Sequence, residues 1–169
     1  MIDRLLRLRR GLRLLNRLTA AAAALAILFS CFAITGSVLL RAARVSTTWQ
    51  LEAAVFMMIY AAFVGAAYTH ETGGQINIPF IDHYLGPRAR RWHRSALDLA
   101  ALALFTLLAV SGWKRAWQAW EMGWASETIW GPPLWIPYAA VPLGAALMIA
   151  NLAVDLILRL AGATPRAEA

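Results

Sequence analysis

The sequence predicts an all-α integral membrane protein with four transmembrane helices and both termini in the cytoplasm. Hydrophobic residues make up 60% of the 169 residues and charged residues 15%, whereas a soluble domain has about 45–50% apolar and about 25% charged residues. The apolar residues gather in four long runs, and a run of about 20 residues crosses the roughly 30 Å hydrocarbon core of a bilayer. These runs cover about residues 18–40, 51–68, 96–113 and 134–158.

The chain begins with a basic segment, residues 1–17, which contains six arginines. Its leucines recur at intervals of three and four residues, so they share one face of a helix. They are Leu5, Leu8, Leu12 and Leu15. The pattern predicts an amphipathic helix that lies in the head-group layer of the membrane. A frayed cytoplasmic tail is the alternative, because Gly11 weakens the helix.

Small and aromatic residues mark the first two spans. The span at residues 18–40 contains the alanine run Ala20–Ala24, and small residues let a second helix approach closely. The span at residues 51–68 follows Trp49, and tryptophan is typical of the membrane–water interface. We therefore expect Trp49 at the outer interface.

A polar connection and a tryptophan stripe flank the third span. Residues 73–94 form the longest polar connection and are expected to lie along the membrane surface. After the third span, residues 96–113, tryptophans recur at steps of four, three and four, which is one helical stripe. They are Trp113, Trp117, Trp120 and Trp124. The stripe suits interfacial anchoring, while packing against a partner subunit is an alternative, and both can hold.

The fourth span, residues 134–158, contains Pro142, which lies beyond the first turn and is expected to kink the helix. Asn151 is the most deeply placed strongly polar side chain in the four spans. We expect it to hydrogen-bond across helices, because polar side chains within a membrane find partners on neighbouring helices. Residues 161–169 form a short polar tail.

The distribution of basic residues predicts the orientation of the spans. With the N-terminus in the cytoplasm, twelve basic residues lie on the cytoplasmic side and four on the outer side. Loops on the cytoplasmic side carry the excess of lysine and arginine in membrane proteins. An even number of spans then places both termini inside.

Ionisable residues near the ends of the spans are functional candidates, because charged groups in a membrane are costly. Glu52 opens the second span, where it either complements the helix dipole or contacts another subunit. Asp98 follows Arg94 by four residues, which predicts a local pair. Asp155 precedes Arg159 by four residues, which predicts a second intrahelical pair.

The sequence contains no motif for catalysis or for a cofactor. None of the ionisable candidates lies at the centre of a span, and we expect no enzyme activity. The three histidines lie at a helix end or in the polar connection, whereas a membrane cytochrome holds its haem within the spans. No His/Cys spacing predicts zinc. The basic residues flank apolar runs, which favours membrane lipids over nucleic acid as partners.

Three groups of residues follow one another along the chain. The first is Trp49 with Glu52, the second is Phe63-x-Gly65-Ala66-Ala67-Tyr68 with Gly73-Gly74-Gln75-Ile76, and the third is Pro133-Leu134-Trp135-x-Pro137-Tyr138 with Pro142-x-Gly144. In this order and spacing, residues 15–160 resemble the small membrane subunit (small permease) of tripartite ATP-independent periplasmic (TRAP) transporters. Many members carry two acids after the tryptophan, whereas this chain carries Glu52 alone.

The resemblance implies a scaffold or anchoring subunit of a sodium-driven symporter that imports organic acids across the bacterial inner membrane. Such a subunit would assemble with a large multi-span permease, which carries the substrate and sodium sites, and with a periplasmic substrate-binding protein. Trp49, Glu52 and Trp135 are the candidate partner contacts. The alternative function is a membrane-anchor subunit of a redox enzyme complex, which would require bound haem or quinone.

Overall fold

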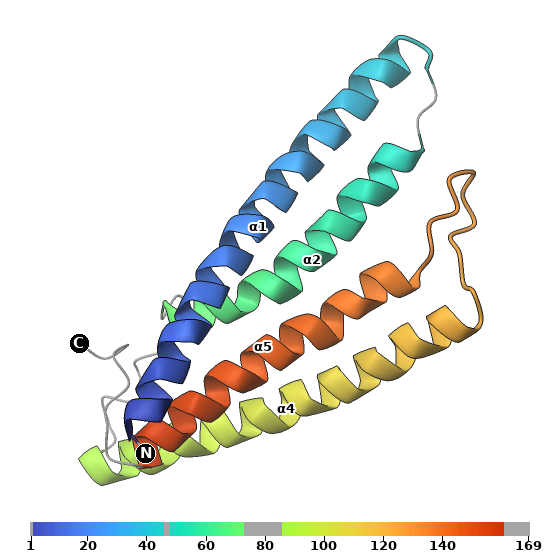
Figure 1. The fold of residues 1–169 in the computed structure, drawn as a ribbon. Coiled ribbons are helices and arrows are strands. Elements are labelled where there is room, and N and C mark those ends of the chain that lie inside the picture. Colours follow the sequence, from blue (N-terminus) through green and yellow to red (C-terminus); the bar gives the residue numbers. More distant parts are fainter. Residues whose placement is uncertain (1, 46–47, 73–85, 161–169) are drawn as a thin grey trace.

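The computed structural model describes residues 2–45, 48–72 and 86–160, and within these it leaves out the side chains of residues 2–8, 87–91, 94, 159 and 160. The regular structure of the described residues is helical (Figure 1). The helices are α1 (Ile2–Ala42), α2 (Trp49–Glu71), α4 (Pro87–Glu121) and α5 (Trp135–Leu160). All four are long and apolar enough to cross a membrane. The predicted all-α membrane fold with four spanning helices is therefore confirmed, whereas the cytoplasmic placement of both termini stays a prediction.

α1 is one helix of 41 residues, which at 1.5 Å per residue is about 61 Å long. The basic segment at residues 2–17 continues directly into the first span, and Figure 1 shows the two as one run of ribbon. The sequence pattern predicts a separate helix in the head-group layer, but a continuous helix cannot both lie in that layer and cross the bilayer. Gly11 does not interrupt it, since a single helical glycine costs only about 1 kcal/mol.

α4 is also longer than the predicted third span. It begins at Pro87 and ends at Glu121, so it includes the last part of the expected polar connection and most of the tryptophan stripe. Proline is favourable in the first turn of a helix, because its missing N–H has no partner there anyway. The rest of that connection, residues 73–85, lies outside the described residues.

The helices pack in the order α1, α2, α5, α4, and α5 is the most buried of the four. α1 packs along α2, α4 packs along α5, and α2 joins the two pairs through α5. Figure 1 shows the two pairs converging where α1 begins and diverging toward residues 42–49 and 122–134. We call these two ends of the bundle the N-terminal end and the loop end.

Two glycines allow α5 to sit between its neighbours. A Cβ atom on Gly144 of α5 would collide with the backbone carbonyl of Phe63 in α2. A Cβ atom on Gly112 of α4 would lie 2.9 Å from Pro142 Cδ and 2.9 Å from Val141 Cγ1. α5 remains helical through Pro142, so the proline ring packs in the space that Gly112 leaves. Backbone contact at this distance is how helices pack in a membrane, where no hydrophobic effect drives them together.

The face of α1 that meets α2 is built from small and polar residues. Asn16, Ser30 and Ser37 are its buried polar side chains. Ala20, Ala23, Ile27 and Ile34 lie between them at steps of three and four. Ser30 Oγ donates a hydrogen bond that is shared between Ala26 O within α1 and Ala54 O of α2, at 2.8 and 3.0 Å. The larger apolar side chains of α1 point outward, which is the arrangement expected of a helix surrounded by lipid.

Candidate functional site

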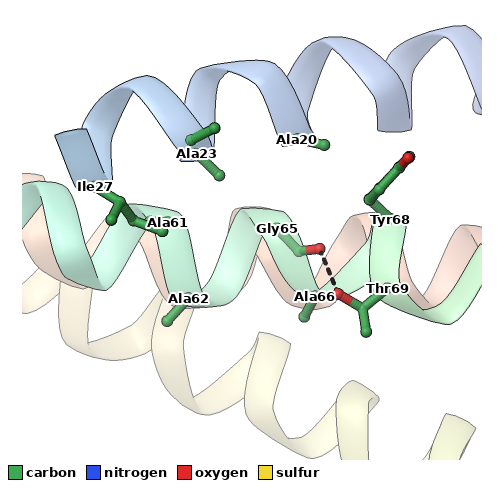
Figure 2. Close-up of a pocket in the computed structure, with 10 residues that line it drawn as sticks. Ala20, Ala23, Ile27, Ala61, Ala62, Gly65, Ala66, Tyr68 and Thr69 are labelled. Atoms are coloured by element: carbon green, nitrogen blue, oxygen red, sulfur yellow. Dashed lines mark hydrogen bonds between the residues drawn. The ribbon is translucent and has the colours of Figure 1, made fainter. Parts of the chain in front are cut away.

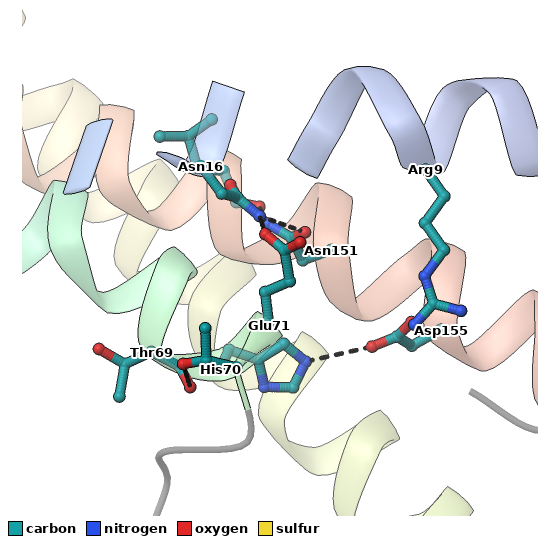
Figure 3. Close-up of polar contacts among 9 residues, drawn as sticks. Arg9, Asn16, Thr69, His70, Glu71, Asn151 and Asp155 are labelled. Carbon is teal, nitrogen blue, oxygen red and sulfur yellow. Dashed lines mark hydrogen bonds and ion pairs between the residues drawn. The ribbon is translucent and has the colours of Figure 1, made fainter. Parts of the chain in front are cut away.

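Polar side chains of α1, α2 and α5 meet at the N-terminal end of the bundle (Figure 3). Asn16 is fully buried, and its Nδ2 donates hydrogen bonds to Glu71 Oε2 at 2.7 Å and to Asn151 Oδ1 at 2.9 Å. Asn151 Nδ2 donates in return to Asn16 Oδ1 at 3.3 Å and to Leu147 O at 2.8 Å. The prediction that Asn151 hydrogen-bonds across helices is therefore confirmed.

An ion pair and a contact between a histidine and a carboxylate lie beside this amide pair. Arg9 Nη2 of α1 lies 3.4 Å from Asp155 Oδ1, and His70 Nε2 of α2 lies 3.5 Å from Asp155 Oδ2. Figure 3 shows Asp155 of α5 between these two side chains. We name the whole set the polar clamp. Its members are Arg9, Asn16, His70, Glu71, Asn151 and Asp155.

The clamp changes the interpretation of Asp155. The sequence predicts a pair with Arg159 on the same helix, whereas the described contacts of Asp155 are with α1 and α2. The side chains of Arg159 and Arg94 lie outside the described residues. The predicted pairs Asp155–Arg159 and Arg94–Asp98 therefore stay predictions.

The clamp links three helices through groups that would be costly to bury alone. A buried amide or carboxylate without a hydrogen bond destabilises the folded state by about 1–3 kcal/mol. Water is scarce near the hydrocarbon core, so it does not replace a missing partner. Interhelical hydrogen bonds in membranes contribute about 0.6–2 kcal/mol each. The reciprocal amide pair satisfies Asn16 and Asn151 together, and it does so only when α1 and α5 are in this register.

A second set of contacts lies at the loop end, where residues 122–134 fold back toward α2. The segment is held by hydrogen bonds from Ser126 N to Pro132 O and from Leu134 N to Trp124 O, at 3.0 and 2.9 Å. Gly123 and Gly131 have φ of +62° and +55°, the left-handed conformation that glycine adopts without strain. The segment is thus an ordered hairpin-like loop.

Two of the candidate partner contacts hold this loop in place. Ser126 Oγ donates a hydrogen bond of 2.5 Å to Glu52 Oε1 near the start of α2. The ring of Trp130 meets that of Trp49 edge-on, with centroids 6.3 Å apart. The other carboxylate oxygen, Glu52 Oε2, is buried and has no hydrogen-bond partner among the described residues. Glu52 and Trp49 therefore contact their own chain at the loop end of α2.

The tryptophan stripe divides between helix and loop. Trp113 and Trp117 stack with centroids 6.3 Å apart, and both are more than half exposed. Trp120 meets Trp135 edge-on at 5.0 Å, which joins α4 to the start of α5. Trp124 lies beyond the last residue of α4. The prediction that all four tryptophans lie on one helix is therefore wrong. The helix ends at Glu121 because the loop turns back there at Gly123.

A shallow groove runs between α1 and α2 on the side of the bundle (Figure 2). Its volume is about 590 Å³, and alanines from both helices form most of its lining. They include Ala20, Ala23 and Ala24 of α1 and Ala61, Ala62 and Ala66 of α2. Thr69 Oγ1 donates to Gly65 O at 3.4 Å beside it. A Cβ atom on Gly65 of α2 would lie 3.4 Å from Ala23 Cβ, so this part of the alanine run lies where α1 approaches α2 closely, as expected.

Sequence reasoning missed most of the clamp. The leucine pattern of the basic segment predicts an apolar face there, and no pattern assigns a role in the clamp to Arg9, Asn16, His70 or Glu71. A signal was present, because Arg9, Arg13, Asn16 and the alanines that follow recur at alternating steps of four and three. That spacing marks the face by which one helix packs on another. Its polar members indicate buried hydrogen bonds rather than contact with water.

Comparison with known proteins gives the family. Residues 30–162 match the family model described as tripartite ATP-independent periplasmic transporters, DctQ component. The chain belongs to this family. It is therefore a component of a membrane transporter, of the small-permease type. Two of the six clamp residues, Arg9 and Asn16, precede the region that matches the DctQ family model.

A curated relative supports the DctQ assignment. The chain is 30% identical over 105 residues to the C4-dicarboxylate TRAP transporter small permease protein DctQ of Rhodobacter capsulatus. The aligned region covers 62% of this chain and 45% of that relative. The chain thus spans less than half the length of the curated relative that it matches.

Proposed function

We propose that this chain is the small scaffold subunit of a secondary TRAP-type importer of organic acids, driven by an ion gradient. It assembles with a large multi-span permease and with a periplasmic substrate-binding protein in the bacterial inner membrane. The observation that carries the proposal is the match of residues 30–162 to the DctQ component family. The relative's name includes C4-dicarboxylate, which makes a four-carbon dicarboxylate the first substrate to test.

The arrangement of polar and apolar groups supports a scaffold. The polar clamp and the hydrogen bond from Tyr60 Oη to Ile136 O join helices of the same chain. The Glu52–Ser126 hydrogen bond joins α2 to the loop 122–134. Large apolar side chains are exposed along α1, α2 and α4. Helices tied to one another by polar contacts, with an apolar exterior, suit a body that rests in lipid or against another membrane protein.

The N-terminal end of the bundle is proposed to be cytoplasmic. The twelve basic residues that flank the spans on this side, against four on the other, support that orientation. The loop end then faces the periplasm. Glu52, Trp49 and Trp135 lie at or near that end, where the binding protein arrives.

The three candidate partner contacts are Glu52, Trp49 and Trp135. We propose that they shape the outer surface of the subunit by holding loop 122–134 and the start of α5 in place. We further propose that the exposed part of Trp49 contacts a partner protein. Trp113 and Trp117, which are more than half exposed on α4, are proposed as interfacial anchors. Trp120 contacts Trp135 at the start of α5, and Trp124 lies in the loop that follows α4.

Co-purification and uptake test the function. A tagged chain, expressed with the neighbouring transporter genes, is expected to retain the large permease through detergent extraction and gel filtration. Deleting either gene should abolish sodium-dependent uptake of radiolabelled succinate or of another organic acid that the binding protein retains. A tagged chain that purifies alone at normal yield from these cells would refute the assembly. A Soret band in the purified protein would instead support a redox anchor.

A further inference from the structure

Direct packing between α1 and α5 is slight, because α2 lies between them for most of their length. Two contacts of the polar clamp nevertheless join these helices. Asn16 forms the amide pair with Asn151, and Arg9 pairs with Asp155. Both contacts lie at the N-terminal end, where Figure 1 shows the helices converging. The clamp is therefore the main polar tie between the first and last helices of the described chain.

The clamp permits one register of α1. Asn16 is fully buried and Asn151 nearly so, and both amides donate and accept across the same pair. Sliding α1 by one turn, about 5.4 Å, would separate this pair and also part Arg9 from Asp155. Each buried polar group left without a partner would cost about 1–3 kcal/mol. Apolar side chains alone would not fix the register in this way, because a leucine that slides by one turn only exchanges one apolar neighbour for another.

We propose that the polar clamp fixes the N-terminal part of α1 against α5 within this chain alone, so that the subunit is already a rigid brace before the large permease binds. The importance of this inference rests on the proposed scaffold function. The claim that the clamp fixes α1 against α5 concerns only this chain's own residues, so it can be wrong even if the scaffold function is right. A brace that is rigid by itself needs no partner to order it, which lowers the entropic cost of assembly.

Adjacent arginines provide a matched control. Arg9 lies in the clamp with about a fifth of its side chain exposed, whereas Arg10 is exposed. Arg9→Gln and Arg10→Gln remove the same charge from neighbouring positions of the same helix. Only the first breaks a contact with α5. Asn16→Asp is a stronger test, because it replaces an amide donor by a carboxylate of the same shape beside Glu71.

Spin-label distances in the full chain test the clamp. Cys31, the free cysteine, is replaced by serine, and labels are placed on cysteines at Leu14 of α1 and Ile157 of α5, which are 62% and 43% exposed. The labelled chain is measured by pulsed electron paramagnetic resonance in lipid nanodiscs, without the large permease. We expect one narrow distance distribution for the parent and for Arg10→Gln. Arg9→Gln and Asn16→Asp should broaden the distribution or shift it by several ångström.

The outcomes separate the clamp from the scaffold function. Distributions for Arg9→Gln and Asn16→Asp that match the parent would overturn the proposal. So would a parent distribution that is broad alone and narrows only when the large permease is added, although the scaffold function would then stand. If Asn16→Asp is not recovered from membranes, a double-mutant cycle of Arg9→Gln with Asp155→Asn decides. We expect the effects of these two variants on thermal stability to be non-additive, and those of Arg10→Gln with Asp155→Asn to be additive.

Discussion

At the scale of single residues, the absence of a side chain at Gly144 and Gly112 sets how closely α5 approaches its neighbours. A Cβ on Gly144 would meet the backbone of Phe63, which cannot move without moving α2. A Cβ on Gly112 would meet the side chains of Val141 and Pro142, which have slightly more freedom. By contrast, a Cβ on Gly36 of α1 would meet nothing within 4 Å.

These environments predict a ranked series of glycine-to-alanine variants. Gly144→Ala should be the most destabilising, by about 1–3 kcal/mol as expected for overpacking, and Gly112→Ala should have a smaller effect. Gly36→Ala should be neutral or stabilising by up to about 1 kcal/mol, because alanine is the better helix former. Thermal unfolding of the purified variants in one detergent measures the series. Equal stability of Gly144→Ala and Gly36→Ala would contradict the close contact between α5 and α2.

At the scale of elements, the loop between α4 and α5 depends on a contact with α2. The loop is ordered by its own backbone hydrogen bonds, and Glu52 and Trp49 tie it to the other helix pair. Glu52 lies in the first turn of α2, where a carboxylate is also favoured by the helix dipole. One side chain therefore stabilises the start of α2 and positions the loop.

Variants at Glu52 and Ser126 distinguish this role from direct recognition of a partner by charge. Glu52→Gln keeps an oxygen that accepts from Ser126, so near-normal uptake is expected if positioning the loop is the role. Ser126→Ala leaves the buried carboxylate without that donor, a cost of about 1–3 kcal/mol, and should speed hydrogen exchange in residues 122–134. Ser111→Ala, at an exposed position of α4, is the control. Loss of uptake in Glu52→Gln with unchanged hydrogen exchange would favour contact between the charge and a partner.

At the scale of the whole molecule, the helices form a row rather than a closed bundle. α1 and α4 stand at the two ends of the row, and α5 is the most buried span. Such a row presents broad apolar faces, which in a soluble protein would cause aggregation and in a membrane rest against lipid or a neighbouring protein. This shape is consistent with the proposed scaffold role, in which the apolar faces rest against a larger membrane subunit.

The orientation of the row predicts which sites water-soluble reagents reach. In a Cys31→Ser background, cysteine at Ile129, which is 97% exposed at the tip of the loop, should react with a membrane-impermeant maleimide in intact spheroplasts. Cysteine at Arg10, exposed at the N-terminal end, should react only after the membrane is opened. Labelling of both positions in intact spheroplasts, or the reverse pattern, would contradict the proposed topology.

The sequence predicts a contact of the site more readily when the two residues that form it lie close together along the chain. A hydrogen bond from Asn151 across helices is predictable because any buried amide needs a partner, but its partner Asn16 lies 135 residues away. Glu52 and Ser126 are 74 residues apart. The local rule that pairs residues four apart predicts a contact between Asp155 and Arg159, which stays a prediction. It gives no indication of the contacts that Asp155 makes with Arg9 and His70 on other helices.

Local properties of the sequence are enough to define the number of spans, their approximate positions and the fold class, because lipid acts directly on the length of an apolar run and on the charges beside it. The tertiary structure was needed to show how far α1 and α4 continue beyond the predicted spans, which faces of the helices meet, and which polar groups become partners. These features depend on the register and order in which the helices pack. That order is set by small residues such as Gly144 and by reciprocal hydrogen bonds such as those of Asn16, whose partners are far away in the chain.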